Sequence, residues 1–405
     1  MVAGVPVHQA NDILGASYQL YQHVETHDIV LRTVSYSLPE ALYAHIQTVA
    51  PTTYFGSPLT QPRTLSGEMP AEREKVGSEE SVGVQPRGAK GLFITPSYLR
   101  WMYKTLGYVP KAADRNSIGI AGYNMQYPSL QDLRAFMQIF RADARGATFT
   151  GVQLNGGTHD PRIPGKEASL NLQLAEVMTY PTPNVYYLTG GLSGTATDPY
   201  LNWLGSVLSQ IRIPQTISTS YSSDEHEVPP DQAKELCRLF AVLGVRGVSV
   251  LFSSGNSGVG PKDCGVPGSS GVTMFIPRFP ASCMCGTFFY LCPKAAHRLR
   301  YRCSQYHHDF VGPWVTTVGG TTGDNPEVAA TISGGGFSNY FPRPFYQAYA
   351  VPPFLGNNGD KYQGRFKLVD FLDLARTDLT TPYFVLMVAL MAVAIPTSPH
   401  RRSIS

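Results

Sequence analysis

The stretch GVSVLFSSGNSGVG, residues 247–260, joins an apolar run to a loop of small residues. Residues 248–251 predict a buried strand, and the Gly and Ser residues after them predict a tight turn at its carboxyl end. The loop is not a P-loop, because residues 261–263, Pro-Lys-Asp, bring a Lys too late. It is not a Gly-x-Ser-x-Gly nucleophile turn either, because it is one residue short. The role of Asn256, which stands among the small residues, therefore depends on the rest of the chain.

Outward from this stretch, strand and helix patterns alternate. Ser129 is placed to cap a helix whose apolar positions share one face. Alternation of this kind predicts an α/β fold, a parallel sheet flanked by helices, with functional groups at the carboxyl ends of the strands. Besides the strand at 247–255, strands are expected at 117–123, 184–190 and 215–221, and helices from 130 to 140, at 167–178, 200–211 and 231–243.

The first 65 residues have a different pattern, typical of a small α+β unit. Apolar spacing predicts helices at 11–21 and 38–49, and alternation predicts a strand at 29–36. Residues 66–92 carry Pro, Gly, Ser and charges with almost no large apolar side chain, which indicates a linker. Near the other end, residues 383–395 form an apolar run of thirteen, short of the roughly 20 residues that a membrane helix needs.

Composition excludes some classes of function. Of the 405 residues 15% are charged, and 32 basic against 29 acidic residues leave a net charge of +3 with no concentrated basic stripe. Nucleic acid is therefore not an expected partner, and neither is a membrane. The amino terminus has no basic start and no sustained apolar core, so no signal peptide is recognised in this chain. Six cysteines would allow one or two disulfides in a secreted protein.

Three groups of residues have side chains suited to chemistry, and each also has an ordinary explanation. Glu167 and Asn171 share a helix face, as either an acid/base site or a plain polar surface. Residues 224–227, Asp-Glu-His-Glu, precede two prolines and are expected in a solvated turn. Residues 283–308 hold four Cys and three His, but the spacing matches no usual zinc pattern, so no metal site is expected.

Five motifs occur together in an order that resembles the sedolisins, the serine-carboxyl peptidases, and in particular their fungal tripeptidyl-peptidase branch. They are EASLNLQ (167–173), SSGNSGVG (253–260), FPASC (279–283), PWVTTVGGT (313–321) and SGGGFSNYFPRP (333–344). The resemblance covers about residues 5–364, and residues 1–65 look like the carboxyl part of that family's activation prodomain. It implies a subtilisin-like parallel sheet and a secreted, extracellular, acid-active peptidase that removes tripeptides from free amino termini. The implied partners are a peptide or protein substrate and the chain's own prodomain, with the protein a monomer.

The resemblance assigns roles where residues match. Glu167 stands at the position of the general base. Asn171 stands where the family has an Asp that orients and protonates that base, and an amide cannot share a proton in this way. Asn256 takes the position of the oxyanion Asp, and an amide there can still donate a hydrogen bond at any ordinary pH.

The nucleophile is the main departure from the family. Its Ser lies in a Ser-Gly-Thr-Ser motif, which does not occur in this sequence, so no nucleophilic Ser is found. Residues 93–364 are therefore expected to form an incomplete catalytic domain, with an insertion at 284–312 and a tail at 365–405 that have no family counterpart. The family's calcium-binding loop is missing along with that motif, so calcium is a cofactor of the family whose site is absent here. Read-through of non-coding sequence explains both breaks most simply, and a genuine insertion is the alternative.

The remaining features need no nucleophile. The segment ISTSYSSDE (217–225) matches the strand that lines the family's substrate groove, which makes Ser218, Ser220 and Tyr221 substrate-binding candidates whose backbone would pair with an extended peptide. Cys264 and Cys283 are placed like a family disulfide. The sequence thus predicts an inactive relative of a tripeptidyl-peptidase, with a truncated product or a pseudoenzyme that at most binds peptides as the alternative.

Overall fold

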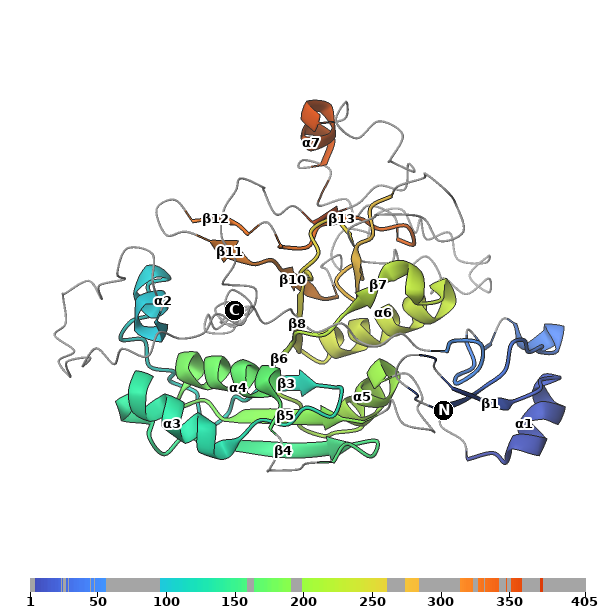
Figure 1. The fold of residues 1–405 in the computed structure, drawn as a ribbon, viewed down its shortest axis with the longest axis horizontal. Helices are drawn as coiled ribbons and strands as arrows, with labels where there is room; N and C mark the ends of the chain where they lie inside the picture. Colours follow the sequence, from blue (N-terminus) through green and yellow to red (C-terminus); the bar gives the residue numbers. More distant parts are fainter. Residues whose placement is uncertain are drawn as a thin grey trace, which may run out of the picture.

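In the computed structural model (Figure 1), most of residues 4–55, 95–283 and 314–358 are described, together with residues 372 and 373. The larger gaps within these ranges are 159–163, 191–198, 261–273 and 342–346. The expected linker at 66–92, the insertion at 284–312 and the apolar run at 383–395 lie outside the described residues. Among the helices that are described, none has the length and apolar character needed to cross a membrane.

Six parallel strands form the central sheet, in the order β10-β8-β6-β3-β5-β4. All four strands expected from the apolar runs are present in it, because such runs suit strands that are buried on both faces. β4 and β10, the two edge strands, were not predicted, and half of the six residues of β4 are exposed. The strands are β3 (Ile118–Gly122), β4 (Phe149–Leu154), β5 (Asn184–Thr189), β6 (Thr216–Thr219), β8 (Ser249–Ser253) and β10 (Thr316–Val318).

Helices cover both faces of the sheet. The four helices predicted from 3.6-residue spacing are confirmed, and the Ser129 side chain caps α3 by accepting a hydrogen bond from the Asp132 N–H at 3.0 Å. The helices of this part are α2 (Pro96–Met102), α3 (Leu130–Phe140), α4 (Lys166–Thr179), α5 (Pro199–Leu208), α6 (Pro230–Val245) and α7 (Val351–Asn358).

The strands divide their side chains between two apolar cores. Successive residues of a strand point to opposite faces, so the neighbours Tyr186 and Tyr187 of β5 enter different cores. Tyr186 packs with residues of α3 and α4, among them Leu133. Tyr187 packs with α5 and α6, where Trp203 is fully buried. Burial on both faces fixes the register of the sheet, because a one-residue slip would exchange the two cores.

The amino-terminal unit contains α1 (Val7–Leu14) and an antiparallel pair, β1 (Gln19–Gln22) with β2 (Ile29–Arg32). The strand predicted at 29–36 is therefore confirmed in its first half. The helix predicted at 11–21 is wrong in position, because α1 ends at Gly15, whose φ of 53° is left-handed. The helix predicted at 38–49 is wrong as well, since the described residues of that range form a single 3₁₀ turn at Glu40–Leu42. Figure 1 shows this blue unit at one end of the molecule, near α5 and α6.

Short 3₁₀ turns and two-residue strands occur in the loops outside the central sheet. The two 3₁₀ turns there are η2 (Ala142–Ala144) and η3 (Glu225–Glu227). The antiparallel pairs are β7 (Ser223–Asp224) with β9 (Arg278–Phe279), β11 (Thr321–Thr322) with β12 (Val328–Ala329), and β13 (Gly336–Phe337) with β14 (Leu372–Asp373). β14 falls in the expected tail, so at least two residues of that tail pair with the family-like part of the chain.

Candidate functional site

The candidate site lies at the carboxyl edge of the parallel sheet. Each strand of such a sheet ends at the same edge, where the loops can supply functional side chains. The loop after β8 carries Asn256, the loop after β6 carries Ser220 and Tyr221, and the first turn of α4 carries Glu167. The topology thus brings these residues to one edge although they are spread over 90 positions of the sequence.

Glu167 is a buried carboxyl group at the beginning of α4, with 3% of its surface exposed. Gly165 precedes the helix in extended backbone, and a Cβ there would lie 2.6 Å from the Cβ of Gln126, so only glycine allows this close approach. Asn171 follows one turn later and is equally buried. Glu167 and Asn171 therefore share a helix face as the spacing predicted. That face is buried, so the alternative of an ordinary polar surface is wrong.

Burial decides the protonation of Glu167. Loss of water raises the pKa of its carboxyl group to about 8, and the neighbouring Asn171 amide offsets only part of this effect. Among the described residues, neither carboxyl oxygen has a partner with full hydrogen-bond geometry. An acid group that is buried, without such a partner and mostly protonated near neutral pH is the kind of group found in functional sites more often than in ordinary cores.

Two buried tyrosines, Tyr186 and Tyr221, lie near Glu167, and of these the sequence singled out only Tyr221, as a substrate-binding candidate. Tyr221 packs edge-on against Tyr123 with ring centroids 5.2 Å apart, and its carbonyl accepts a hydrogen bond of 2.9 Å from the Tyr200 hydroxyl. Burial is the main cause that raises the pKa of Tyr221, and the nearby Glu167 charge adds to it. The Tyr186 hydroxyl donates to the Gln126 carbonyl at 3.1 Å. Tyr123 and Tyr221 follow buried strands, whereas Tyr186 lies within β5 and Tyr200 within a helix, so these tyrosines have no common signal in the sequence.

The Asn256 loop is held by two other segments of the chain. Ser254 Oγ accepts a hydrogen bond of 3.0 Å from the Gly334 N–H, and the same N–H lies 3.1 Å from the Gly255 carbonyl. From the other direction, the Ser254 N–H donates to the Val318 carbonyl. The motifs SSGNSGVG, PWVTTVGGT and SGGGFSNYFPRP therefore meet at one corner, and the half-buried Asn256 side chain lies in the loop that they support.

The substrate-binding candidates need a correction. A peptide strand cannot be added beside Ser218, because β6 already pairs there with Ile120 of β3 and with Leu251 of β8. The Tyr221 side chain is completely buried in the core and is therefore not a groove surface. Ser220 lies one residue beyond the last paired residue of β6, so of the three candidates it is the one whose backbone a peptide could pair with.

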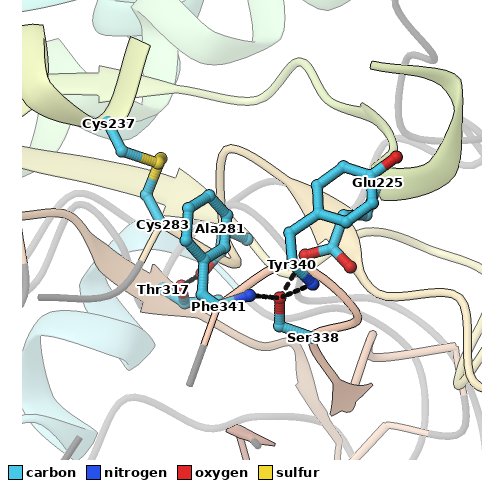
Figure 2. Close-up of a disulfide and its surroundings, with 8 residues drawn as sticks. All are labelled: Glu225, Cys237, Ala281, Cys283, Thr317, Ser338, Tyr340 and Phe341. Carbon is cyan, nitrogen blue, oxygen red and sulfur yellow. Dashed lines mark hydrogen bonds between the residues drawn. A yellow bond between two sulfur atoms is a disulfide. The ribbon is translucent and has the colours of Figure 1, made fainter. Parts of the chain in front are cut away.

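The disulfide expected between Cys264 and Cys283 is wrong in one partner. Cys283 is bonded to Cys237, with the two Cα atoms 5.4 Å apart (Figure 2). Cys237 lies on the face of α6 that packs against the sheet, and Cys283 follows β9, so the fold brings together two cysteines that are 46 positions apart. Because a cysteine forms one disulfide, Cys283 is not available to Cys264, which lies outside the described residues.

The expectation of a solvated turn at 224–227 is wrong for Glu225. This side chain is fully buried, and its carboxyl group accepts hydrogen bonds from Ser338 Oγ at 2.5 Å and from the Asn339 N–H at 2.6 Å. Figure 2 shows the Ser338 hydroxyl next to this carboxyl group and bonded to the backbone N–H groups of Tyr340 and Phe341. Burial raises the pKa of Glu225, which these donors oppose. Glu225 thus anchors the 338–341 segment.

Metal ligands were not expected, and the described residues contain one arrangement that could be considered. Ligand atoms of Asp224, His226 and Glu227 lie within 4.8 Å of one another. The set does not suit the calcium of the family, because Ca²⁺ takes six to eight oxygen ligands, whereas this set has an imidazole and a carboxylate that is paired with Arg278. The Cys and His residues of 284–308 lie outside the described part of the chain.

Comparisons with known proteins agree with the motifs. Residues 1–55 match the family described as "Pro-kumamolisin, activation domain". The "Probable tripeptidyl-peptidase SED2" of Arthroderma benhamiae is 33% identical over 352 residues, which cover 83% of this chain and 53% of that protein. The "Tripeptidyl-peptidase sed4" of Aspergillus fumigatus is 31% identical, with 93% and 61% covered. The chain thus spans little more than half the length of the curated relatives it matches.

A solved structure also matches. It is "Pseudomonas sedolisin (serine-carboxyl proteinase) complexed with two molecules of pseudo-iodotyrostatin", at 17% identity and a TM-score of 0.40, over 63% of this chain and 65% of that one. Both values are too low to carry an argument about individual residues. The fungal relatives, which align over most of this chain, are the stronger finding.

Proposed function

Since the chain belongs to the sedolisin family, in its fungal tripeptidyl-peptidase branch, we propose that its 405 residues bind extended peptides at the carboxyl edge of the sheet without cleaving them. The observation that carries the proposal is the burial of the Glu167 carboxyl group, which keeps it protonated. This group is buried at the site edge, and on the same helix face Asn171 carries an amide at the position where the motif resemblance led us to expect a second carboxyl group.

The chemistry of Glu167 supports the non-cleaving part. A general base must be deprotonated at the working pH before it can accept a proton. Burial raises the pKa of this carboxyl group to about 8, so it keeps its proton at acidic pH. Asn171 cannot take a proton from it or return one. A nucleophile motif is absent from the 405 residues, and the members of a catalytic unit act together, so a partial set loses nearly all of the rate.

The loops support the peptide-binding part. Asn256 carries an amide that can donate a hydrogen bond to a peptide carbonyl, at a corner braced by three segments. Ser220 lies just past the paired part of β6, and its backbone offers an extended peptide a place to pair. The proposed ligand is therefore an extended peptide whose carbonyl oxygen lies at Asn256.

The proposal includes an extracellular location and a monomer. The Cys237–Cys283 disulfide supports the location, because such bonds persist in oxidising compartments. The activation-domain match at residues 1–55 supports a role for the chain's own amino-terminal unit as a partner of the site. Thr48 Oγ1 lies 3.4 Å from Asp231 Oδ2 of α6, which is a direct contact between this unit and the sheet domain.

The test uses the full chain. Binding of a fluorescent peptide with a free amino terminus is measured by anisotropy, and turnover by release of a tripeptide from a fluorogenic substrate between about pH 3 and 6. Saturable binding without turnover is expected. Glu176→Gln is the matched control for Glu167→Gln, since Glu176 is a buried glutamate of the same helix.

Two results would overturn the proposal. Turnover that Glu167→Gln abolishes and Glu176→Gln retains would show that the chain is an active peptidase. Absence of peptide binding by the folded chain would remove the binding role.

A further inference from the structure

Arg278 forms a nearly buried ion pair close to the Asn256 loop. The register of β7 and β9 places Arg278 opposite Asp224. Arg278 Nη1 lies 2.6 Å from Asp224 Oδ1, with the two side chains only 10% and 14% exposed. With so little water around it, the pair is screened much less by salt than a surface pair. The guanidinium of Arg278 therefore has a defined position.

The same side chain contacts the Asn256 loop at two points. Arg278 Nη2 donates a hydrogen bond of 3.0 Å to Ser257 Oγ. Gly255 has a φ of 94°, and a Cβ there would lie 2.5 Å from Arg278 Cγ, so the aliphatic part of the arginine occupies the space beside this glycine. Residues 255 and 257 flank Asn256. One side chain thus contacts the residues immediately before and after the amide.

Backbone bonds hold the loop through other segments. The Gly258 N–H donates to the Ile332 carbonyl at 3.2 Å, and the Gly335 N–H donates to the Gly258 carbonyl at 3.1 Å. The Ile276 N–H donates to the Val259 carbonyl at 2.9 Å, which ties the loop to the segment that leads into β9. Arg278 adds side-chain contacts on both sides of Asn256 to these backbone bonds.

We propose that Arg278 is a positioning residue that holds Asn256 in the orientation needed to bind a peptide carbonyl, with Asp224 fixing the arginine. This rests on the peptide-binding function proposed above and adds to it a residue that acts through the loop and not on the peptide. A donor that is already oriented costs less conformational entropy on binding than a mobile one. Arginine suits the task, because its planar group has several donors in a fixed arrangement and can serve Asp224 and Ser257 together.

The experiment compares four variants of the full chain. Arg278→Met removes the charge, Arg278→Lys retains it, and Ser257→Ala removes only the contact to the loop. Arg141→Met is the matched control, because Arg141 is 7% exposed, pairs with Asp143 at 2.9 Å and follows α3 at the opposite edge of the sheet. Two quantities are measured: hydrogen exchange of residues 254–260 by mass spectrometry, and the Kd for the fluorescent peptide.

Arg278→Met is expected to raise exchange in 254–260 about tenfold and to weaken peptide binding by a similar factor, the usual effect of losing a charge-assisted hydrogen bond. Arg278→Lys is expected to show smaller rises in exchange and in Kd than Arg278→Met, since one ammonium group can reach only one of the two partners well. Ser257→Ala, which leaves the ion pair intact, is expected to raise exchange in the loop by a smaller factor. Arg141→Met should leave the loop and the Kd unchanged.

Unchanged exchange in 254–260 for both Arg278→Met and Ser257→Ala would overturn the positioning role, whatever the peptide does. An equal rise in Arg141→Met would also overturn it, because the effect would then reflect general loss of stability. Failure of the unmodified chain to bind peptide would instead refute the proposed function, while the exchange data would still decide whether Arg278 holds the loop.

Discussion

We predict that Glu167→Gln reduces the slope with which the free energy of unfolding changes with pH. Burial raises the pKa of Glu167 from 4.5 to about 8. A carboxyl group with a raised pKa in the folded state stabilises the fold in its protonated form. Its contribution is fully present below the unfolded pKa and is lost as the pH rises through the folded value. The relevant window therefore runs from about pH 4.5 to 8.

The magnitude follows from the two pKa values. Their difference is about 3.5, and each pKa unit corresponds to about 1.4 kcal/mol, so the whole contribution is about 5 kcal/mol. Within the window the unfolded chain has released this proton and the folded chain has kept it. The free energy of unfolding should therefore fall by about 1.4 kcal/mol for each pH unit because of Glu167 alone. Glutamine does not titrate, so the variant lacks this part of the slope.

The assay is urea unfolding at pH 5, 6 and 7, followed by tryptophan fluorescence. Glu176→Gln is the internal comparison, because burial raises the pKa of Glu176 to about 8 as well. The two side chains are nine residues apart on α4, or about 13 Å along the axis, and their effects should add in the double variant. A slope for Glu167→Gln equal to that of the unmodified chain would refute the reasoning, since it would mean that Glu167 is ionised in the folded protein.

Three further changes test other parts of the structure. Cys237→Ser, which breaks the bond to Cys283, should lower the free energy of unfolding by about 2–4 kcal/mol, and a reducing agent should lower Tm less in this variant than in the unmodified chain. Glu225→Gln should lower the free energy of unfolding, measured by urea titration, by about 2–4 kcal/mol, because the glutamine amide cannot accept from every donor that faces the carboxyl group. A loss below about 0.5 kcal/mol would contradict the anchoring role of these hydrogen bonds. Gly255→Ala should lower Tm more than Gly107→Ala, since both have positive φ but only the first meets a neighbouring side chain.

Local patterns predicted most of the sheet domain. The segments that became β3, β5, β6 and β8 are buried along most of their length, and all except β6 are rich in the apolar residues typical of buried parallel strands. β4 was missed because it is an edge strand with alternating burial and a glycine, Gly151, so it lacks that signal. The amino-terminal helix was misplaced because apolar spacing cannot locate the left-handed residue at which a helix ends.

The candidate site was predicted unevenly. Glu167 and Asn171 share a face, and Asn256 is in a loop at a strand end, as spacing and motif order indicated. The roles of Glu225 and Arg278 were not foreseen, because each depends on a partner more than 20 positions away. The local sequence around Glu225 would be the same whether its side chain faced water or, as here, the Ser338 hydroxyl.

By itself the sequence determined the alternation of strands and helices and the family motifs, since both depend on neighbouring residues. Only the tertiary structure decided that Cys283 bonds to Cys237, that Ser218 is already paired on both sides, and that Glu167 is buried deeply enough to keep its proton. The physical reason is that pairing, burial and pKa depend on distances between residues that are far apart in the chain, and those distances exist only after folding.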